Sequence, residues 1–266
     1  MNPVTFSIDA TLAAGAVSAL TRAGGLVATA PILAGEGTPA MLKVLITAGL
    51  AMAILPTAPA SALISAAGPI ETGVLLAAEA LIGASLGFAA RAVLSAAEGA
   101  GELLGFQSGV SMGQVFDPLT QQPNNPFAFI QGAVASQAFI VVGGLGWLAL
   151  ALARSYDAVP PMAGLAPAAL LTGRLVALGS WVIEGSLLLL APALMSAALL
   201  DLLILSVGRA VPALHLMIVA LPLKVLTGFL LLALVTHHSA PALAALMDRA
   251  RALIEDVAGL LSPALA

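Results

Sequence analysis

The residues of this 266-residue chain that could do chemistry are concentrated between positions 98 and 118. The segment reads EGAGELLGFQSGVSMGQVFDP and gathers carboxylates, amides and glycines in an otherwise strongly apolar chain. Within it, residues 109–113 match G-x-S-x-G, the turn that presents a nucleophilic serine, here Ser111, in many hydrolases. A catalytic base would have to come from far downstream, at His215, His237 or His238. Serine hydrolysis is therefore the first chemistry to weigh.

The serine motif fits a helix better than a hydrolase turn. A nucleophile elbow needs a preceding strand, whereas Glu102 to Gln107 has the pattern of a helix. A rhomboid-like intramembrane protease would place glycine directly after the serine, where this chain has Met112. Adjacent His237 and His238 would point about 100° apart on a helix, so they make a poor metal pair. We expect no catalytic, cofactor-binding or metal site, and interpret Ser111 as a small residue at a helix contact or a turn.

Glycine recurs at every fourth position of the segment, and this spacing puts the glycines on one face of a helix. Such a stripe lets another backbone approach closely, and we expect it to continue through Ser111. The polar side chains beside it cost several kcal/mol each in hydrocarbon unless protein or water satisfies them, so a protein-lined or wet interior is predicted. The residues predicted to pack helices here are Gly101, Glu102, Gly105, Gln107, Gly109, Ser111, Gly113, Asp117 and Pro118.

The composition of the whole chain is that of an integral membrane protein. Hydrophobic residues make up 61% and charged residues 8%, and the mean hydropathy is +1.09, whereas soluble domains are roughly 25% charged. Windows without charge, such as Val44 to Ile70 and Phe127 to Ala153, exceed the roughly 20 residues that span a bilayer. We predict an all-α, polytopic membrane protein of six to seven apolar helices. Pro192, Pro212 and Pro222 lie inside apolar runs and are predicted to kink or interrupt their helices.

Charge and cysteine content exclude several classes of function. The net charge of −4 and the scattered basic residues provide no footprint for nucleic acid. The absence of cysteine excludes disulfides, thiolate metal sites and cysteine nucleophiles. The basic residues do not decide the membrane orientation either, because they are divided between loops of both parities.

Charged residues inside the apolar runs allow two interpretations. In a transporter they would form ion sites or proton relays. In a multisubunit pore they would be neutralised by helix ends or by neighbouring chains on assembly. The residues alone leave both open, and the charges predicted to be buried or to contact partners are Arg22, Lys43, Glu184, Asp201, Arg209 and Lys224.

The domain organisation is predicted to be a single membrane unit over residues 1–266, since no linker or internal repeat is present. A polar loop rich in Gln, Asn and Pro is expected at about residues 109–126. A short charged helix is expected over residues 248–258, where Arg251 lies four residues before Glu255.

The order of short motifs along nearly the whole chain resembles the bacterial type III export-gate family, called FliR in flagella and SctT in injectisomes. The resemblance begins with Arg22, continues through TAPIL at residues 29–33, and ends with Gly208-Arg209 and Pro222-Leu223. The central part of the chain is closer to the flagellar branch, because it contains in order AGE, glycine, QxGxS and Asp117-Pro118. The injectisome branch remains the alternative, and a secondary transporter is less favoured.

The resemblance implies a subunit of the flagellar export gate in the bacterial inner membrane and the flagellar basal body, without enzymatic activity. It implies partners named FliP, FliQ and FlhB, helical hairpins stacked into a multisubunit channel, and passage of unfolded flagellar proteins through that channel. The segment before Asp-Pro would help to plug the channel, and here it holds Met112, Val115 and Phe116. The family often has two phenylalanines in this stretch, so the plug of this chain departs from the pattern. Independently, a flexible thioether beside apolar side chains suits a seal that closes around varied substrates.

Overall fold

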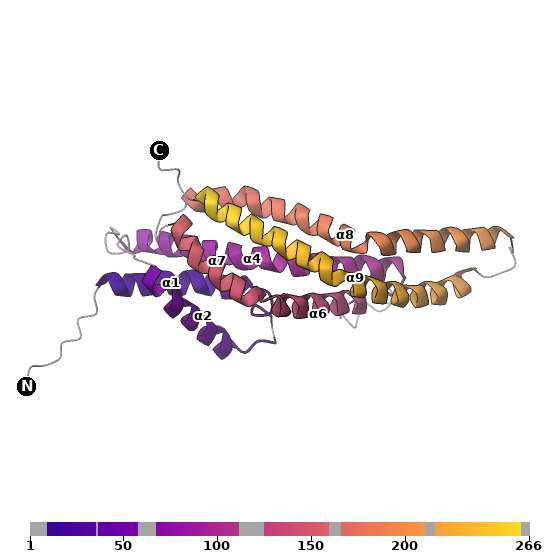
Figure 1. Ribbon diagram of the computed structural model, residues 1–266, viewed down its shortest axis with the longest axis horizontal. Coiled ribbons are helices and arrows are strands. Elements are labelled where there is room, and N and C mark those ends of the chain that lie inside the picture. Colours follow the sequence, from indigo (N-terminus) through magenta and orange to yellow (C-terminus); the bar gives the residue numbers. More distant parts are fainter. Residues whose placement is uncertain are drawn as a thin grey trace, which may run out of the picture. The chain divides into compact units, whose positions relative to one another are not determined.

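The computed structural model is built of helices, and no strand occurs in the part of the chain that it describes (Figure 1). It describes residues 10–35, 37–57, 68–111, 125–159, 166–210 and 216–261. The elements in chain order are α1 (Ala10–Thr29), α2 (Ala40–Ile54), the 3₁₀ turn η1 (Leu55–Thr57), α4 (Pro69–Gln107), α6 (Pro126–Val141), α7 (Gly144–Ala158), α8 (Ala166–Ala210) and α9 (Leu216–Leu261). The all-α prediction is confirmed.

Four of these helices are long and apolar enough to cross a membrane. They lie in α1, α4, α8 and α9, and the bent pair formed by α6 and α7 adds a fifth if it counts as one span. The predicted polytopic membrane protein is therefore confirmed. The predicted tail at residues 248–258 is the last part of α9 rather than a separate helix.

A sharp bend divides the uncharged stretch from Phe127 to Ala153. The helices α6 and α7 meet at an angle of 65°. Gly143 lies at the break with φ at +81°, a conformation in which a side chain would be strained. Hydropathy gives no sign of this break, because the residues on both sides of it are mostly apolar, and uncharged as far as Ala153.

Prolines interrupt the helices less than the sequence predicts. Helix α8 continues through Pro192, and α9 continues through Pro222. Of the predicted kink or interruption, the interruption is therefore absent at both positions, and the kink stays a prediction. One proline removes a single backbone hydrogen bond, and helices of 45 and 46 residues retain the others. Pro212 lies outside the described residues.

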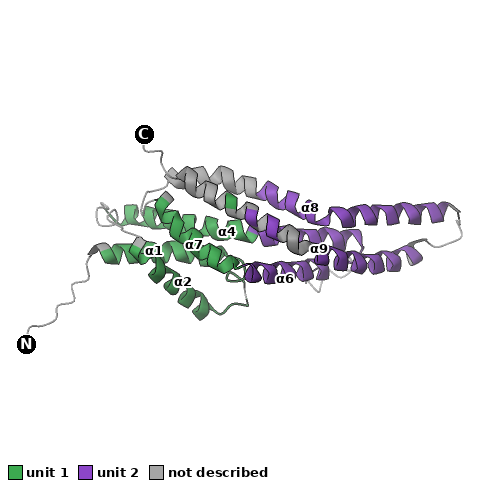
Figure 2. Cartoon of the chain, in the orientation of Figure 1, with its two compact units in different colours: residues 1–91, 143–178, 249–266 green, residues 92–142, 179–248 purple. Residues whose placement is uncertain are grey.

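The chain divides into two compact units, coloured separately in Figure 2. Unit 1 comprises residues 1–91, 143–178 and 249–266, and unit 2 comprises residues 92–142 and 179–248. Unit 1 therefore contains α1, α2, the first part of α4, and α7, whereas unit 2 contains the end of α4, all of α6, and the larger parts of α8 and α9.

Close packing of α1 against α4 builds the core of unit 1. A Cβ added at Gly83 would overlap the backbone of Arg22 and Leu26, and a Cβ at Gly25 would overlap the backbone of Ala80. Ala19, Ala23, Ala90 and several other small residues of these helices are fully or almost fully buried. Small side chains therefore let the two backbones come into contact, as in other membrane helix pairs.

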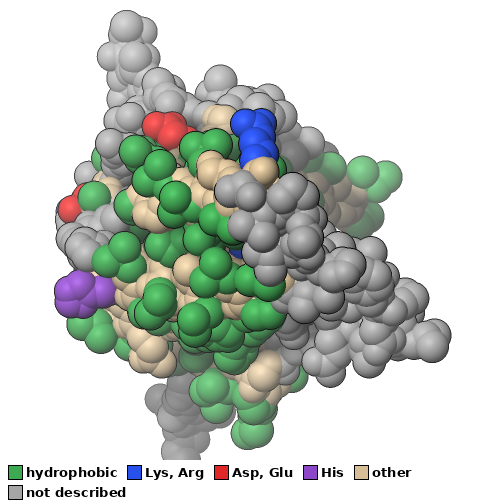
Figure 3. All heavy atoms as spheres, turned by 90° about the vertical axis from the view of Figure 1, so that its right-hand side faces the viewer, with side chains coloured by type: hydrophobic (Ala, Val, Ile, Leu, Met, Phe, Trp, Pro, Cys, Tyr) green, Lys and Arg blue, Asp and Glu red, His purple; other side chains and the backbone are tan. Residues whose placement is uncertain are grey.

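Unit 2 leaves much apolar surface uncovered. In the apolar spans of α8 (Gly179–Arg209) and α9 (Val219–His237), only 22% and 17% of the residues are buried. Hydrophobic side chains predominate among the coloured atoms of the view in Figure 3, and charged groups are isolated points. Such continuous apolar faces need lipid or partner helices to cover them.

Candidate functional site

The glycine-rich segment contains the end of a long helix. Helix α4 ends at Gln107, and residues 108–111 form turns. Gly109 has φ at +77°, and its N–H donates to the Phe106 carbonyl at 3.1 Å, as in a glycine C-cap. The predicted continuation of the helical glycine ladder through Ser111 is therefore wrong, because Gly109 adopts the left-handed conformation that ends the helix.

Of the glycines that recur at every fourth position, the two that lie within α4 contact the start of α6 closely. A Cβ at Gly101 would meet the backbone of Phe127 and Ala128, and a Cβ at Gly105 would overlap the side chain of Asn125. Glycine at these positions lets α6 begin directly against the last turns of α4.

Asn125 connects the two ends of the chain segment between α4 and α6. Its Oδ1 accepts from the Phe127 N–H at 3.0 Å and so caps α6. Its Nδ2 donates to the carbonyls of Gly101 and Glu102, both at 3.2 Å, in the last turns of α4. Since Asn125 is fully buried, these bonds hold the base of the segment 108–124 together at both of its ends.

A chain of polar contacts extends from the end of α4 to α8 and α9. Gln107 Nε2 donates to Asp201 Oδ2 at 2.9 Å, and Lys224 Nζ pairs with Asp201 Oδ1 at 2.6 Å. The ion pair is partly exposed, with 30% and 33% of the two side chains accessible. Three of the predicted site residues therefore come together, and the charges of Asp201 and Lys224 are compensated within one chain rather than by a partner.

Aromatic and small side chains pack the same base against α9. The rings of Phe127 and Phe229 meet edge to face, with centroids 4.9 Å apart. A Cβ added at Gly228 would overlap Ser108, and one added at Gly109 would lie 3.0 Å from Leu221. The helix end, the cap of α6 and α9 thus form one packed support for the intervening segment.

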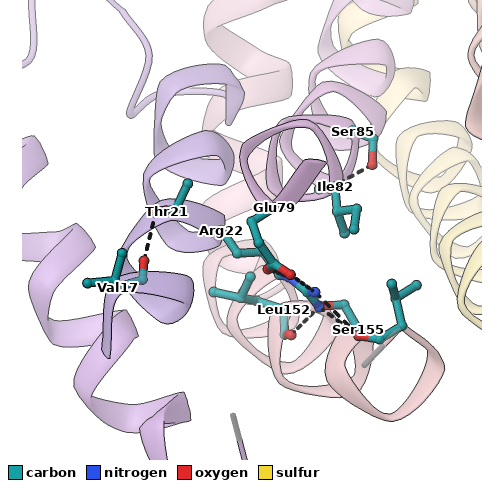
Figure 4. Close-up of polar contacts among 9 residues, drawn as sticks. Val17, Thr21, Arg22, Glu79, Ile82, Ser85, Leu152 and Ser155 are labelled. Carbon is teal, nitrogen blue, oxygen red and sulfur yellow. Dashed lines mark hydrogen bonds and ion pairs between the residues drawn. The ribbon is translucent and has the colours of Figure 1, made fainter. Parts of the chain in front are cut away.

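Arg22 is at the centre of a separate polar cluster in unit 1 (Figure 4). Its Nε and Nη2 donate to the two carboxylate oxygens of Glu79 at 2.6 and 3.0 Å, and Nη1 donates to Ser155 Oγ at 3.0 Å. The Val159 carbonyl accepts from the guanidinium at 3.3 Å, and the Tyr156 ring lies 3.8 Å from its Cζ. Arg22 and Glu79 are 0% and 1% exposed, so this pair is fully enclosed.

Three further predicted charges have no comparable network. Lys43 Nζ donates to the Ala34 carbonyl at 3.3 Å, near the turn between α1 and α2. Glu184 and Arg209 are exposed on α8. Their role as contacts to partner subunits stays a prediction.

The proposed plug residues lie outside the described residues. These are Met112, Val115 and Phe116, together with Gly113, Asp117 and Pro118 of the predicted packing set. Ser111 is the last described residue before them, and it lies in a turn. Its N–H donates to the Gly105 carbonyl at 3.2 Å, and its Oγ has no hydrogen-bond partner in the described part of the chain. Ser111 therefore makes no hydrogen bond to a histidine among the residues described, and no group of three metal-ligating side chains occurs among them either.

Sequence reasoning missed the residues that hold these sites together. Asn125 was expected only as part of a polar loop, although an Asn-Pro pair before an apolar run is a signal for a helix start. Ser155 and Tyr156 carried no signal, because a serine and a tyrosine near a helix end are common in any membrane protein. Glu79 is one of the charges inside the apolar runs, but its pairing with Arg22 spans 57 positions and leaves no local pattern.

Comparison with known proteins places this sequence in a family. Residues 14–250 match the family described as bacterial export proteins, family 1. The chain is 28% identical over 229 residues to the flagellar biosynthetic protein FliR of Escherichia coli (strain K12), a match that covers 84% of each chain.

Proposed function

Because the chain belongs to family 1 of the bacterial export proteins, we propose that it is a subunit of the flagellar type III protein export gate. In this proposal it lies in the bacterial inner membrane at the flagellar basal body and lines part of the channel for unfolded flagellar proteins. The similarity to FliR of E. coli over 84% of both chains favours the flagellar system. The expected partners are FliP, FliQ and FlhB.

The observation that carries the proposal is the closed base of the segment 108–124. Asn125 bonds back to the Gly101 and Glu102 carbonyls, and Gly109 ends α4 with a positive φ. A segment whose two ends are fixed in this way can extend into a channel without loosening the helices that carry it. The polar contacts of Gln107, Asp201 and Lys224 support the same base from α8 and α9.

The segment so held contains the apolar side chains of a seal. Met112, Val115 and Phe116 are the proposed plug, and Met112 and Phe116 are four residues apart. A channel wide enough for an unfolded chain is far wider than a hydrated ion, so it conducts unless apolar groups close it. Methionine suits this task because its unbranched thioether adapts to irregular surfaces. The proposal needs no covalent chemistry.

Deletion of residues 110–116 tests the plug directly. The deletion removes seven residues of the loop, so the complex should still assemble, while cells that express the whole gate should become permeable to ions and small solutes. The measurement is membrane conductance or solute uptake, together with recovery of the tagged complex. Replacing Met112 and Phe116 by serine should give a milder leak. Normal barrier function of the deletion with normal complex recovery would show that this segment is not the seal.

Substitution at Ser111 separates export from proteolysis. A packing or turn residue tolerates alanine, whereas a nucleophile does not. We expect a strain that carries Ser111→Ala to secrete flagellar subunits and swim as the wild type does. Loss of a substrate cleavage with an intact complex would instead favour a hydrolase.

A further inference from the structure

An open cavity of about 630 Å³ lies in unit 2 between α4 and α6. Its walls carry small side chains, among them Ser95, Gly132, Ala133 and Ser136, and two carboxylates, Glu98 and Glu102. The volume is within the range of about 300–1,000 Å³ that ligand sites occupy, so the cavity admits several side chains. It adjoins the base of the segment 108–124 through Asn125, which also lines it.

The two carboxylates have no compensating charge in the part of the chain that the structure describes. Glu98 is partly exposed and Glu102 exposed, and neither carboxylate takes part in a hydrogen bond or an ion pair with a described residue. They are one helical turn apart, so their charges repel each other. A cation that reaches both carboxylates removes this repulsion.

Unit 2 as a whole holds fewer basic than acidic residues. Its sequence holds six carboxylates but only two cations, Lys224 and Arg209, whereas the seven carboxylates and seven cations of unit 1 balance. Lys224 already pairs with Asp201. Arg209 is exposed at the end of α8. The net charge of the protein therefore lies in unit 2, and its compensation has to come from outside the chain.

A metal ion does not fit the groups that line the cavity. Calcium takes about six to eight oxygen ligands, and magnesium demands an octahedral set. The cavity offers two carboxylates, and the Asn125 amide is already used, since Oδ1 accepts from Phe127 N–H and Nδ2 donates to two carbonyls. No third acidic or histidine ligand joins them among the described residues.

We propose that this cavity, the α4–α6 groove, receives a helix of another export-gate subunit that presents a lysine or arginine among small residues. One guanidinium or ammonium group reaches both Glu98 and Glu102, and the small, exposed side chain of Ala133 allows the incoming backbone to approach closely. Phe129, 70% exposed at the rim, adds an aromatic surface for that helix. The inference rests on the proposed function in taking the partner to be a membrane subunit of the gate.

Charge favours this occupant over the alternatives. Anionic lipid headgroups would be repelled by the two carboxylates. A second copy of this chain would bring the same excess of acid in its own unit 2. A partner helix with a basic residue instead removes the repulsion and covers the groove.

A single thiol identifies the occupant, because the chain has no cysteine of its own. Ser136→Cys carrying a photo-cross-linker should, in cells that express the whole gate, form an adduct with a subunit helix within one turn of a lysine or arginine. In a second experiment without the cross-linker, maleimide should label the Ser136→Cys thiol at least tenfold more slowly in the assembled gate than in the chain alone. Equal labelling rates, or an adduct with lipid or a second copy, would overturn the proposal.

Charge reversal then tests the recognition itself. Glu102→Lys should reduce co-purification of the cross-linked subunit at least tenfold, and the opposite change of the partner's basic residue to glutamate should restore it. Asp248→Asn, an exposed carboxylate of α9 in the same unit, is the matched control and should leave co-purification unchanged. Failure of the paired reversal to restore binding would contradict the proposal.

Filling the groove gives an independent measurement that does not depend on charge. Ala133→Trp should block the partner helix, whereas Gln137→Trp, exposed on α6 but outside the groove, should not. Thermal unfolding of each variant in detergent checks that both still fold. Equal recovery of the complex with both tryptophan variants would contradict the proposed role of the groove. In the cross-linking experiment, an adduct with a basic helix of a protein outside the gate would contradict the proposed function but still support the groove as a binding site.

Discussion

Two ion pairs with the same closest distance lie in very different surroundings. Arg22–Glu79 in unit 1 and Asp201–Lys224 in unit 2 both close to 2.6 Å. The first is enclosed, with 0% and 1% of its side chains exposed, whereas 30% and 33% of the second remain accessible. A buried pair is held by the high cost of separating it, and an accessible pair exchanges with water at little cost. We therefore expect the contacts in unit 1 to be rigid and the Asp201–Lys224 contact at the base of the proposed plug to rearrange more easily.

Several glycines show a similar difference. In unit 1, Gly25 and Gly83 are tight against backbone atoms, which cannot move aside. In unit 2, Gly101 is also tight against backbone atoms, whereas Gly105, Gly132 and Gly228 are tight against the side chains of other residues. Backbone contact fixes the separation of two helices, whereas a side chain can rotate when the helices shift.

The largest expected effect comes from breaking the enclosed pair. Arg22→Met removes the cation that faces the buried Glu79 carboxylate, and truncating one partner of such a pair costs about 3–5 kcal/mol. We expect little folded protein in membranes and a strongly lowered unfolding temperature in detergent. The double variant Arg22→Met with Glu79→Leu should recover most of the loss, and a double variant as unstable as the single one would contradict this explanation.

A smaller effect is expected from adding one methyl group to unit 1. Gly83→Ala places a Cβ on the backbone of α1, and overpacking of this kind costs about 1–3 kcal/mol. Gly132→Ala in unit 2 meets only Glu98 Cγ at 2.9 Å, a flexible side chain that can give way, so its effect should be close to zero. Unfolding of the two purified variants measures the difference, and equal losses would remove the contrast between the units.

An intermediate to small effect is expected at Asn125. Asn125→Ala loses the cap of α6, worth about 0.5–2 kcal/mol, and both bonds to the end of α4. Hydrogen exchange in the first turn of α6 should rise. Asn125→Asp retains the accepting oxygen of the cap but loses the donation to the Gly101 and Glu102 carbonyls, so it isolates the connection between the helices. If both variants impair export, export depends on the bonds from Asn125 to the end of α4. If only the alanine variant impairs export, export depends on the cap of α6.

The smallest effect on stability is expected at the accessible pair. Lys224→Met should cost less than about 1 kcal/mol, because exposed ion pairs contribute about that much at most. A double-mutant cycle with Asp201→Asn measures the coupling. A coupling of several kcal/mol would show that this pair is as rigid as Arg22–Glu79, and the comparison between the units would fail.

The parts of the fold that composition and local pattern determine could be predicted from the sequence. The apolar windows indicated a helical membrane protein, and a polar loop was expected from about residue 109, just after the residue at which α4 ends. Contacts between distant segments could not be predicted. Arg22 and Glu79 each look like an isolated charge, and only the crossing of α1 and α4 brings them together. The bend at Gly143 was also missed, because glycine is common in membrane helices and its dihedral angle leaves no trace in hydropathy.

The enclosed cluster around Arg22 has a consequence for the order of synthesis. Glu79 lies 57 residues after Arg22, and Ser155 lies 133 residues after it. At a synthesis rate of about 5–20 residues per second, Glu79 is therefore made several seconds after Arg22. In that interval α1 carries an uncompensated charge, which costs about 2.5–3.5 kcal/mol at the centre of a helix in the membrane. Completion of the cluster also requires α7, and the whole of residues 92–142 must be translated before it. We therefore expect nascent chains that stop before Ser155 to be rapidly degraded, and pulse-chase labelling of such truncations measures this.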